Sequence, residues 1–358
     1  MALGAEPRRG IGLAVAAEVL FGASAPFAKL LLADAAPQLL AGLLYLGSGI
    51  GLGVIWLGRR RSAEVVRETP LARRDIPWLA GAVIFGGALG PLLLMIGLTS
   101  IPAADASLLL NLEGVFTALL AWFVFRENFD RRIALGMLAI IAGGVVLSWG
   151  GALSWGGLAG PLAVAGACLC WGIDNNLTQK VSAGDPVQIT MIKGLTAGSV
   201  NAAIAFIGGA SWPSAPHVLA ALALGFLSYG LSLVFFVLAL RQLGTARTSA
   251  YFSTAPFVGA LLSLAVFREQ PTMSLLVAGL LMGTGVWLHF TERHEHPHRH
   301  ELLEHAHAHV HDEHHQHPHA SNDPPVTDPT PHTHRHRHEP MVHSHPHYPD
   351  IHHRHAHD

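Results

Sequence analysis

Long apolar segments follow one another along most of this chain, and short polar loops separate them. Ten of the segments contain roughly 18 or more predominantly apolar residues, which is enough for a helix to cross the hydrocarbon core of a bilayer. They span 10–33, 37–57, 76–98, 104–125, 132–149, 158–181, 186–209, 216–240, 246–267 and 273–290. This pattern predicts an all-α integral membrane protein with ten transmembrane helices.

Glycine and alanine recur at four-residue spacing inside several of these segments. Small residues on one face of a helix let two helices approach closely in lipid, where apolar burial does not drive association. We interpret these positions as helix-packing contacts, with these examples: Gly47/Gly51, Gly49/Gly53 and Ala82/Gly86/Gly90.

The composition agrees with a membrane protein and sets the C-terminus apart. Hydrophobic residues make up 51% of the 358 residues and charged residues only 13%, whereas a soluble domain carries roughly 25% charged residues. All histidines except His217 and His289 lie at or after His294. The segment 291–358 has almost no large apolar side chains, so it cannot bury enough surface to fold alone. We expect a disordered, His-rich tail.

The distribution of Lys and Arg predicts the orientation of the chain. With the N-terminus in the cytoplasm, only Arg268 falls in a loop on the opposite side. Because cytoplasmic loops carry the excess of positive charge, we expect a multi-pass protein of the cytoplasmic (inner) membrane with both termini, and hence the tail, in the cytoplasm. The residues in cytoplasmic loops are Arg59, Arg60, Arg61, Arg67, Arg73, Arg74, Arg126, Arg131, Arg132, Lys180, Arg241 and Arg247.

The chain also repeats itself. Residues 98–128 align without a gap with 240–270, and 13–22 align more weakly with 162–172. Each half, 10–150 and 156–290, therefore contains five predicted spans. Because five is odd, the second half enters the membrane from the opposite side, and transporters with inverted repeats bind their substrates near the midplane between the two halves.

Short motifs occur twice, once in each half. "FG" (21–22) and "WG" (171–172) lie in the first helix of each half, and "FRE" closes the fourth helix at 125–127 and 267–269. With ten spans in two halves, this pattern resembles EamA-type members of the drug/metabolite transporter superfamily over about residues 10–290. The resemblance implies a secondary transporter with a cavity lined by the first, third and fourth helices of each half. It names no substrate, and it does not cover the tail.

Ionisable residues inside a membrane span are rare and usually functional. Four lie deep in the predicted spans, namely Glu18, Glu113, Asp174 and Lys193. Asp174 follows Cys170 by four residues, so both share one helix face, and a carboxylate beside a thiol can bind a divalent transition metal. The alternative is a structural ion pair between Asp174 and Lys193.

Other polar residues in the spans are candidates for the substrate or proton path. Asn175 follows Asp174 directly, and Asn111 and Glu113 are two residues apart, so at most one of the latter two faces a cavity. Tyr229 and Tyr251 are further candidates. Proton coupling requires a carboxyl group that exchanges a proton as its exposure changes, and we assign this role to Glu18 and Asp174.

Histidines in the tail alternate with other residues, which brings several imidazoles within reach of one ion. Neutral imidazole is the commonest metal ligand, so the tail is expected to bind Zn, Ni, Co or Cu with little selectivity. The candidate ligands are His305, His307, His309, His311, His314, His315, His317 and His319.

These observations lead to one main hypothesis and two alternatives. The main hypothesis is proton-coupled efflux of divalent transition metal ions, which the tail captures or senses. The first alternative is efflux of a small organic solute such as an amino acid or metabolite, with the tail as a metal or pH regulator. The second is a membrane-anchored metal sensor or store.

Several function classes are not expected. No set of nucleophile, base and oxyanion donors can be assembled, so we expect no enzyme and no required cofactor. With a net charge of −2, the chain has no basic surface for nucleic acid. The expected partners are the bilayer and the transported solute, and a homodimer is a candidate assembly.

Overall fold

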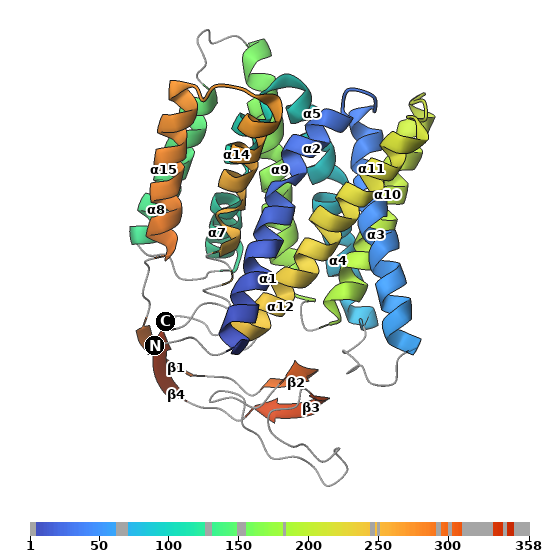
Figure 1. Cartoon of the computed structure of the whole chain (residues 1–358). Coiled ribbons are helices and arrows are strands. Elements are labelled where there is room, and N and C mark those ends of the chain that lie inside the picture. The colour runs from blue at the N-terminus through green and yellow to red at the C-terminus, as the bar shows by residue number, and fades with distance from the viewer. Residues whose placement is uncertain are drawn as a thin grey trace.

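A computed structural model gives the architecture of the chain (Figure 1). It describes residues 5–61, 71–125, 131–148, 155–181, 184–243, 248, 251–290, 295–299, 303–309, 332–338 and 342–346.

The regular elements described in the first half of the chain are all helices. Short breaks separate α1 from α2 and α6 from α7, and a π-helix, η2, lies between α4 and α5. The elements are α1 (Ala5–Gly22), α2 (Ser24–Leu31), α3 (Pro37–Arg61), η1 (Arg73–Asp75), α4 (Ile76–Ala82), η2 (Val83–Leu89), α5 (Gly90–Ser100), α6 (Ala103–Leu109), α7 (Leu112–Phe125) and α8 (Arg131–Ser148).

The second half follows with the same kinds of elements. A second π-helix, η3, lies between α11 and α12. The elements are α9 (Trp155–Gln179), α10 (Pro186–Ile207), α11 (Ala215–Gly225), η3 (Phe226–Leu231), α12 (Ser232–Leu243), α14 (Ala255–Phe267) and α15 (Met273–Phe290). The chain enters α1 and leaves α15 at the same end of the bundle (Figure 1).

Among the described residues, eight helical segments are long and apolar enough to cross a membrane. They coincide with the first eight spans expected from the sequence. The last two expected spans fall on shorter apolar helices, Ala255–Phe267 and Met273–Leu288. Many large apolar side chains on the outside of the bundle are exposed, such as Val54 at 68% and Leu261 at 68%. A surface of this kind fits lipid rather than water, so the protein is an integral, multi-pass membrane protein.

Helices α3 and α10 pack closely against each other through glycines. A Cβ atom on Gly194 would lie 2.6 Å from the backbone nitrogen of Gly49, and one on Gly198 would lie 2.6 Å from that of Leu46. The two backbones are therefore in direct contact. Gly49 belongs to the small-residue stripes seen in the sequence, and its packing role agrees with the expectation for close helix contacts in membranes.

The fourth apolar segment is interrupted in its middle. Helix α6 ends at Leu109 and α7 begins at Leu112. Tight turns close the gap, because the backbone N–H groups of Asn111 and Glu113 donate to the carbonyls of Leu108 and Leu110. Interrupted helices inside a membrane are tolerated only where neighbouring groups satisfy the freed backbone atoms, so this break points to a functional region.

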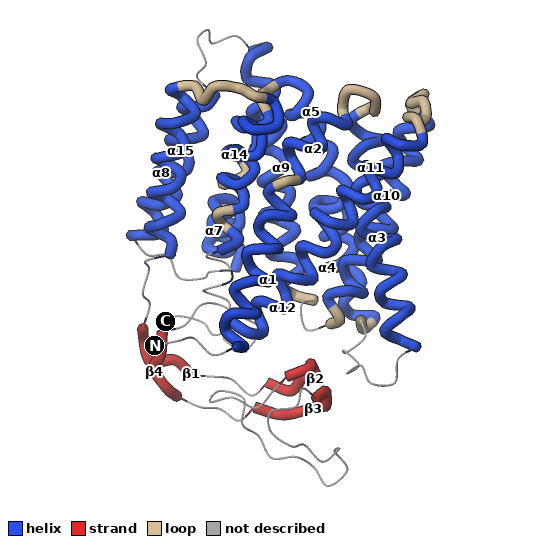
Figure 2. The backbone as a smooth tube through the Cα atoms, in the orientation of Figure 1, coloured by secondary structure: helices blue, strands red, loops and turns tan. Residues whose placement is uncertain are grey.

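Short strands lie in the described parts of the tail (Figure 2). Strand β1 (Glu295–Arg299) pairs antiparallel with β4 (Val342–Pro346), and β2 (Leu303–His309) pairs antiparallel with β3 (His332–His338). The physical reason is the period-two alternation of histidine with other residues, which matches the pleat of a strand. The tail ligand candidates His311, His314, His315, His317 and His319 lie outside the described residues.

Candidate functional site

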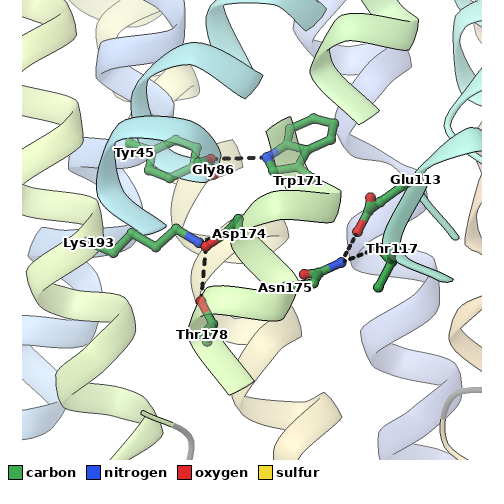
Figure 3. A network of polar contacts seen from close by, with 9 residues as sticks. All are labelled: Tyr45, Gly86, Glu113, Thr117, Trp171, Asp174, Asn175, Thr178 and Lys193. Carbon is green, nitrogen blue, oxygen red and sulfur yellow. Dashed lines mark hydrogen bonds and ion pairs between the residues drawn. The ribbon is translucent and has the colours of Figure 1, made fainter. Parts of the chain in front are cut away.

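A buried ion pair joins α9 to α10 inside the bundle (Figure 3). The ammonium group of Lys193 donates to Oδ2 of Asp174, and the side chains are only 16% and 7% exposed. Thr178, one turn further along α9, donates to Oδ1 of Asp174 over 3.0 Å. The carboxylate therefore has a partner at each oxygen, as a buried charge requires. This is the pairing that the sequence left as the alternative to a metal site.

The next residue on α9 connects the pair to α7. Nδ2 of Asn175 donates to Oε1 of Glu113 over 2.9 Å and contacts Oγ1 of Thr117 at 3.2 Å. Glu113 lies in the first turn of α7, where the partial positive charge of a helix N-terminus stabilises a carboxylate. Of two consecutive residues of α9, Asp174 thus presents its own carboxylate to α10, and Asn175 binds the carboxyl group of Glu113 at the start of α7 (Figure 3).

The π-helix η2 presents backbone carbonyls to this network. The carbonyl oxygen of Gly86 accepts from the hydroxyl of Tyr45 at 2.7 Å and from Nε1 of Trp171 at 3.0 Å. Nδ2 of Asn201 donates to the carbonyl of Ala88 at 3.1 Å. A π-helix disturbs the regular backbone ladder, and such bulges are frequent at functional sites. Here side chains from α3, α9 and α10 satisfy the freed oxygens.

A third acidic group lies on α1 and has its own partner. Glu18 of α1 is buried and accepts a hydrogen bond from the hydroxyl of Thr254. Thr254 occupies the position before α14, and its backbone N–H donates to the carbonyl of Tyr251. Glu18 therefore lies at the N-terminus of α14, much as Glu113 lies at that of α7. Glu18 and Asp174 have different partners on different helices.

Aromatic rings fill the space between α1, α3 and η3. The ring of Tyr229 packs edge-on against Phe21 with centroids 6.2 Å apart and lies 5.5 Å from that of Tyr45. The hydroxyl groups of Ser107 and Ser228 are buried and have no hydrogen-bond partner among the described residues. A buried hydroxyl without a partner is costly, which sets these two groups apart from the paired polar side chains of the network.

The remaining predicted residues are placed as follows. Asn111 donates to the carbonyl of Leu108 at 2.9 Å and contacts the sulfur of Met282 at 3.9 Å, so it turns away from Glu113. Cys170 is a buried free thiol. Within the residues whose side chains are described, no group of three or more His, Cys, Asp or Glu could hold a metal ion.

Sequence reasoning missed the polar contacts of the residues around these acidic groups, namely Tyr45, Gly86, Thr117, Trp171, Asn201 and Thr254. All six are uncharged, and uncharged residues in a span carry no signal of their own. One signal was present, because "FGGALGP" at 85–91 combines three glycines and a proline, which is a composition typical of helix irregularities.

Comparisons with known proteins identify the family. The model of the EamA-like transporter family matches residues 8–149 and again residues 158–291. A protein of Methanothermobacter thermautotrophicus described as an uncharacterized transporter is 28% identical over 287 residues, which are 76% of this chain and 84% of the relative. The uncharacterized transporter YyaM of Bacillus subtilis is 23% identical over 243 residues, or 62% of this chain and 77% of YyaM.

Two further matches are more limited. A probable 4-amino-4-deoxy-L-arabinose-phosphoundecaprenol flippase subunit, ArnE of Pseudomonas fluorescens, is 39% identical over 71 residues, covering 20% of this chain and 60% of ArnE. A crystal structure with 19% identity covers 80% of this chain and 96% of its own, with a TM-score of 0.58, which supports the fold alone. These relatives point to transport rather than catalysis. Because the family model covers both halves, the chain belongs to the EamA-like transporter family.

Proposed function

We propose that this protein is a proton-coupled secondary transporter that exports a small polar organic solute across the cytoplasmic membrane. The observation that carries the proposal is the network of buried polar groups at the interrupted helices. Glu113 lies in the first turn of α7, and Glu18 lies beside the N-terminus of α14. At both carboxyl groups a solute can exchange with a proton. Buried hydroxyls of Ser107 and Ser228 and the aromatic rings around Tyr229 add hydrogen-bonding and apolar surface.

An organic solute is favoured over a metal ion for an electrostatic reason. The Asp174 carboxylate is already neutralised by Lys193, and an ammonium group this close repels a divalent cation. A metal also needs three or more protein ligands in a fixed geometry, and Cys170 with Asp174 supplies two. Divalent metal efflux remains the second candidate, and the histidines of the tail are the feature that favours it.

The proposal includes two halves of inverted topology that move against each other. Extending the alignment of 98–128 with 240–270 backwards places Gly86 of η2 over Ser228 of η3. The two π-helices therefore occupy corresponding positions. Such correspondence between halves is what an inverted repeat requires.

The contacts of two glycines support the same symmetry. A Cβ on Gly22 would lie 3.2 Å from Cβ of Val258, and one on Gly172 would lie 3.0 Å from Cβ of Phe116. In the alignment, Phe116 corresponds to Val258. The "FG" and "WG" motifs thus pack on corresponding positions of the fourth helix in the opposite half.

The orientation with both termini in the cytoplasm is part of the proposal. Helix α3 ends, with Arg59 and Arg60, at the same end of the bundle at which α1 begins (Figure 1). Clustered arginines at one end favour the cytoplasmic side.

The test is solute-driven proton movement in proteoliposomes of the purified full-length protein. Amino acids, other small metabolites and the ions Zn²⁺, Ni²⁺ and Co²⁺ are added separately under an imposed pH gradient, and the internal pH is followed. We expect an organic solute to move protons. Movement with metal ions alone would establish the second candidate. If nothing moves while Zn²⁺ still binds the protein, a membrane-anchored sensor or store is the remaining hypothesis.

Replacing Glu18 with Gln is expected to uncouple transport from protons. The amide keeps an acceptor for Thr254 but cannot exchange a proton, so uptake driven by a pH gradient falls by about tenfold or more while solute counterflow without a gradient persists. The matched control is Glu269→Gln, because Glu269 is an exposed carboxyl group after α14. Equal losses in gradient-driven uptake and counterflow would assign Glu18 to solute binding rather than proton coupling.

Removing the tail after Glu292 is expected to leave solute transport within about twofold, the size of a surface effect. The reason is that the family match ends at residue 291, so the transport core does not include the tail. The measurement is the rate of uptake with and without micromolar Zn²⁺. A truncated protein that no longer transports would place the tail in the transport cycle itself.

A further inference from the structure

Histidines in the tail are paired across the strands with a regular register. In the β2–β3 pair, His305 lies opposite His336, His307 opposite His334, and His309 opposite His332. The β1–β4 pair repeats the pattern, with His296 opposite His345 and His298 opposite His343. Every histidine position of β2 thus lies opposite a histidine position of β3 in the register.

The register also determines which positions share a face of each ribbon. Residues directly opposite each other in an antiparallel pair lie on the same face, with Cβ atoms about 4.5–5.5 Å apart, and positions two apart in one strand share that face. The six paired histidine positions of β2 and β3 therefore fall on one face of one ribbon. The intervening positions, such as Ala306 opposite Arg335, fall on the other face.

We propose that the β2–β3 ribbon is a binding site for a divalent late transition metal ion, built from cross-strand histidine pairs. Four histidine positions in two adjacent pairs, His305, His307, His334 and His336, form one unit of this site. Imidazole is a suitable ligand for Zn, Ni and Cu, and two pairs supply as many ligands as a tetrahedral zinc ion takes. The β1–β4 ribbon offers one further unit of the same kind.

This site differs from an unstructured chelating tail in which histidines are equivalent. Its candidate ligands come from two separate strands, whose nearest paired positions, His309 and His332, are 23 residues apart in the sequence, so a metal ion would hold the two strands together. Histidines that lie in the sequence between β2 and β3, such as His314 and His315, are not part of the proposed site. The inference goes beyond the proposed transport function, because metal binding by the tail is measured without any solute or gradient.

The first experiment compares zinc affinity between variants of the full-length protein in detergent. Zn²⁺ is titrated in competition with a chromophoric chelator. We expect the His307→Ala/His334→Ala variant to bind the first Zn²⁺ ion about tenfold or more weakly, because both histidines of the central pair are removed. The matched control, His314→Ala/His315→Ala, removes the same number of imidazoles and should stay within about twofold. Equal losses in the two variants would overturn the proposal.

A second experiment tests the register independently of metal. Cysteines replace Ala306 and Arg335, which lie opposite each other, and crosslinking by diamide is followed in protein freed of metal with a chelator. Opposite positions in an antiparallel pair are close enough for a disulfide, whereas the control pair Ala306→Cys/Arg337→Cys is displaced along the strand. We expect the first pair to crosslink about tenfold faster. Equal rates would refute the register, and with it the site.

Discussion

Asp174→Asn is expected to abolish solute transport and to destabilise the protein. The substitution leaves the ammonium group of Lys193 buried, with a side chain 16% exposed and without its counter-charge. Breaking one partner of a buried ion pair costs about 3–5 kcal/mol. The transport rate in proteoliposomes should fall at least about 100-fold, and the loss of stability should appear as a lower midpoint of thermal unfolding.

A double variant separates the structural from the functional role of this pair. Asp174→Asn combined with Lys193→Met removes both charges, so it should recover most of the lost stability but none of the transport. The control Asp185→Asn makes the same change at the N-cap of α10, where Asp185 accepts from the backbone of Val187 and Asn caps equally well. Transport by the double variant would mean that the ion pair only holds the fold.

Gly86→Ala is expected to eliminate transport through the same carboxylate. A Cβ atom at Gly86 would lie 2.5 Å from Cβ of Asp174 and closer still to its carboxylate. Neither group can move away freely, because Tyr45 and Trp171 hold the carbonyl of Gly86 and Lys193 holds Asp174. Overpacking of this kind costs about 1–3 kcal/mol, and the displaced carboxylate no longer presents its charge to α10.

The measurements for this variant are transport in proteoliposomes and the midpoint of thermal unfolding. Gly114→Ala serves as the control, since a Cβ atom at Gly114 of α7 has nothing within 4 Å and alanine favours a helix. We expect Gly114→Ala to transport normally. Normal transport by Gly86→Ala as well would show that η2 can move away from α9 without loss, and that the close approach of Gly86 to Asp174 has no part in the mechanism.

The two predictions share a physical basis. Asp174 is positioned by three neighbours, namely Lys193 of α10, Thr178 of α9 and the bare backbone of Gly86 in η2. A charge inside a membrane is stable only when such partners surround it. An arrangement with this many constraints has few alternatives, so a shift between α9 and α10 would break the pair.

Most of the membrane architecture could be predicted from the sequence. Apolar segments of sufficient length identified the spans, because the thickness of the bilayer imposes that length. The repetition of 98–128 in 240–270 and the paired "FG" and "WG" motifs led to the EamA resemblance, which the family match confirms. Charged residues within spans stood out in the sequence for the same reason, since lipid excludes them unless they are functional or paired.

The partners of those charged residues could not be predicted. Both Cys170 and Lys193 were plausible neighbours of Asp174, and only the packing of α9 against α10 selects Lys193. Glu18 finds its partner in Thr254, 236 residues away. Helical periodicity relates residues three or four apart and carries no information on such distant contacts.

The sequence by itself therefore determined the positions of the first eight apolar spans, the family, and which residues carry charge into the membrane, because each of these depends on local composition and length. Only the tertiary structure decided which charges meet, where η2 and the break between α6 and α7 expose backbone groups, and how the histidines of β2 and β3 pair. These features arise when distant segments pack together, and the pairing energies that select them act only at contact distance.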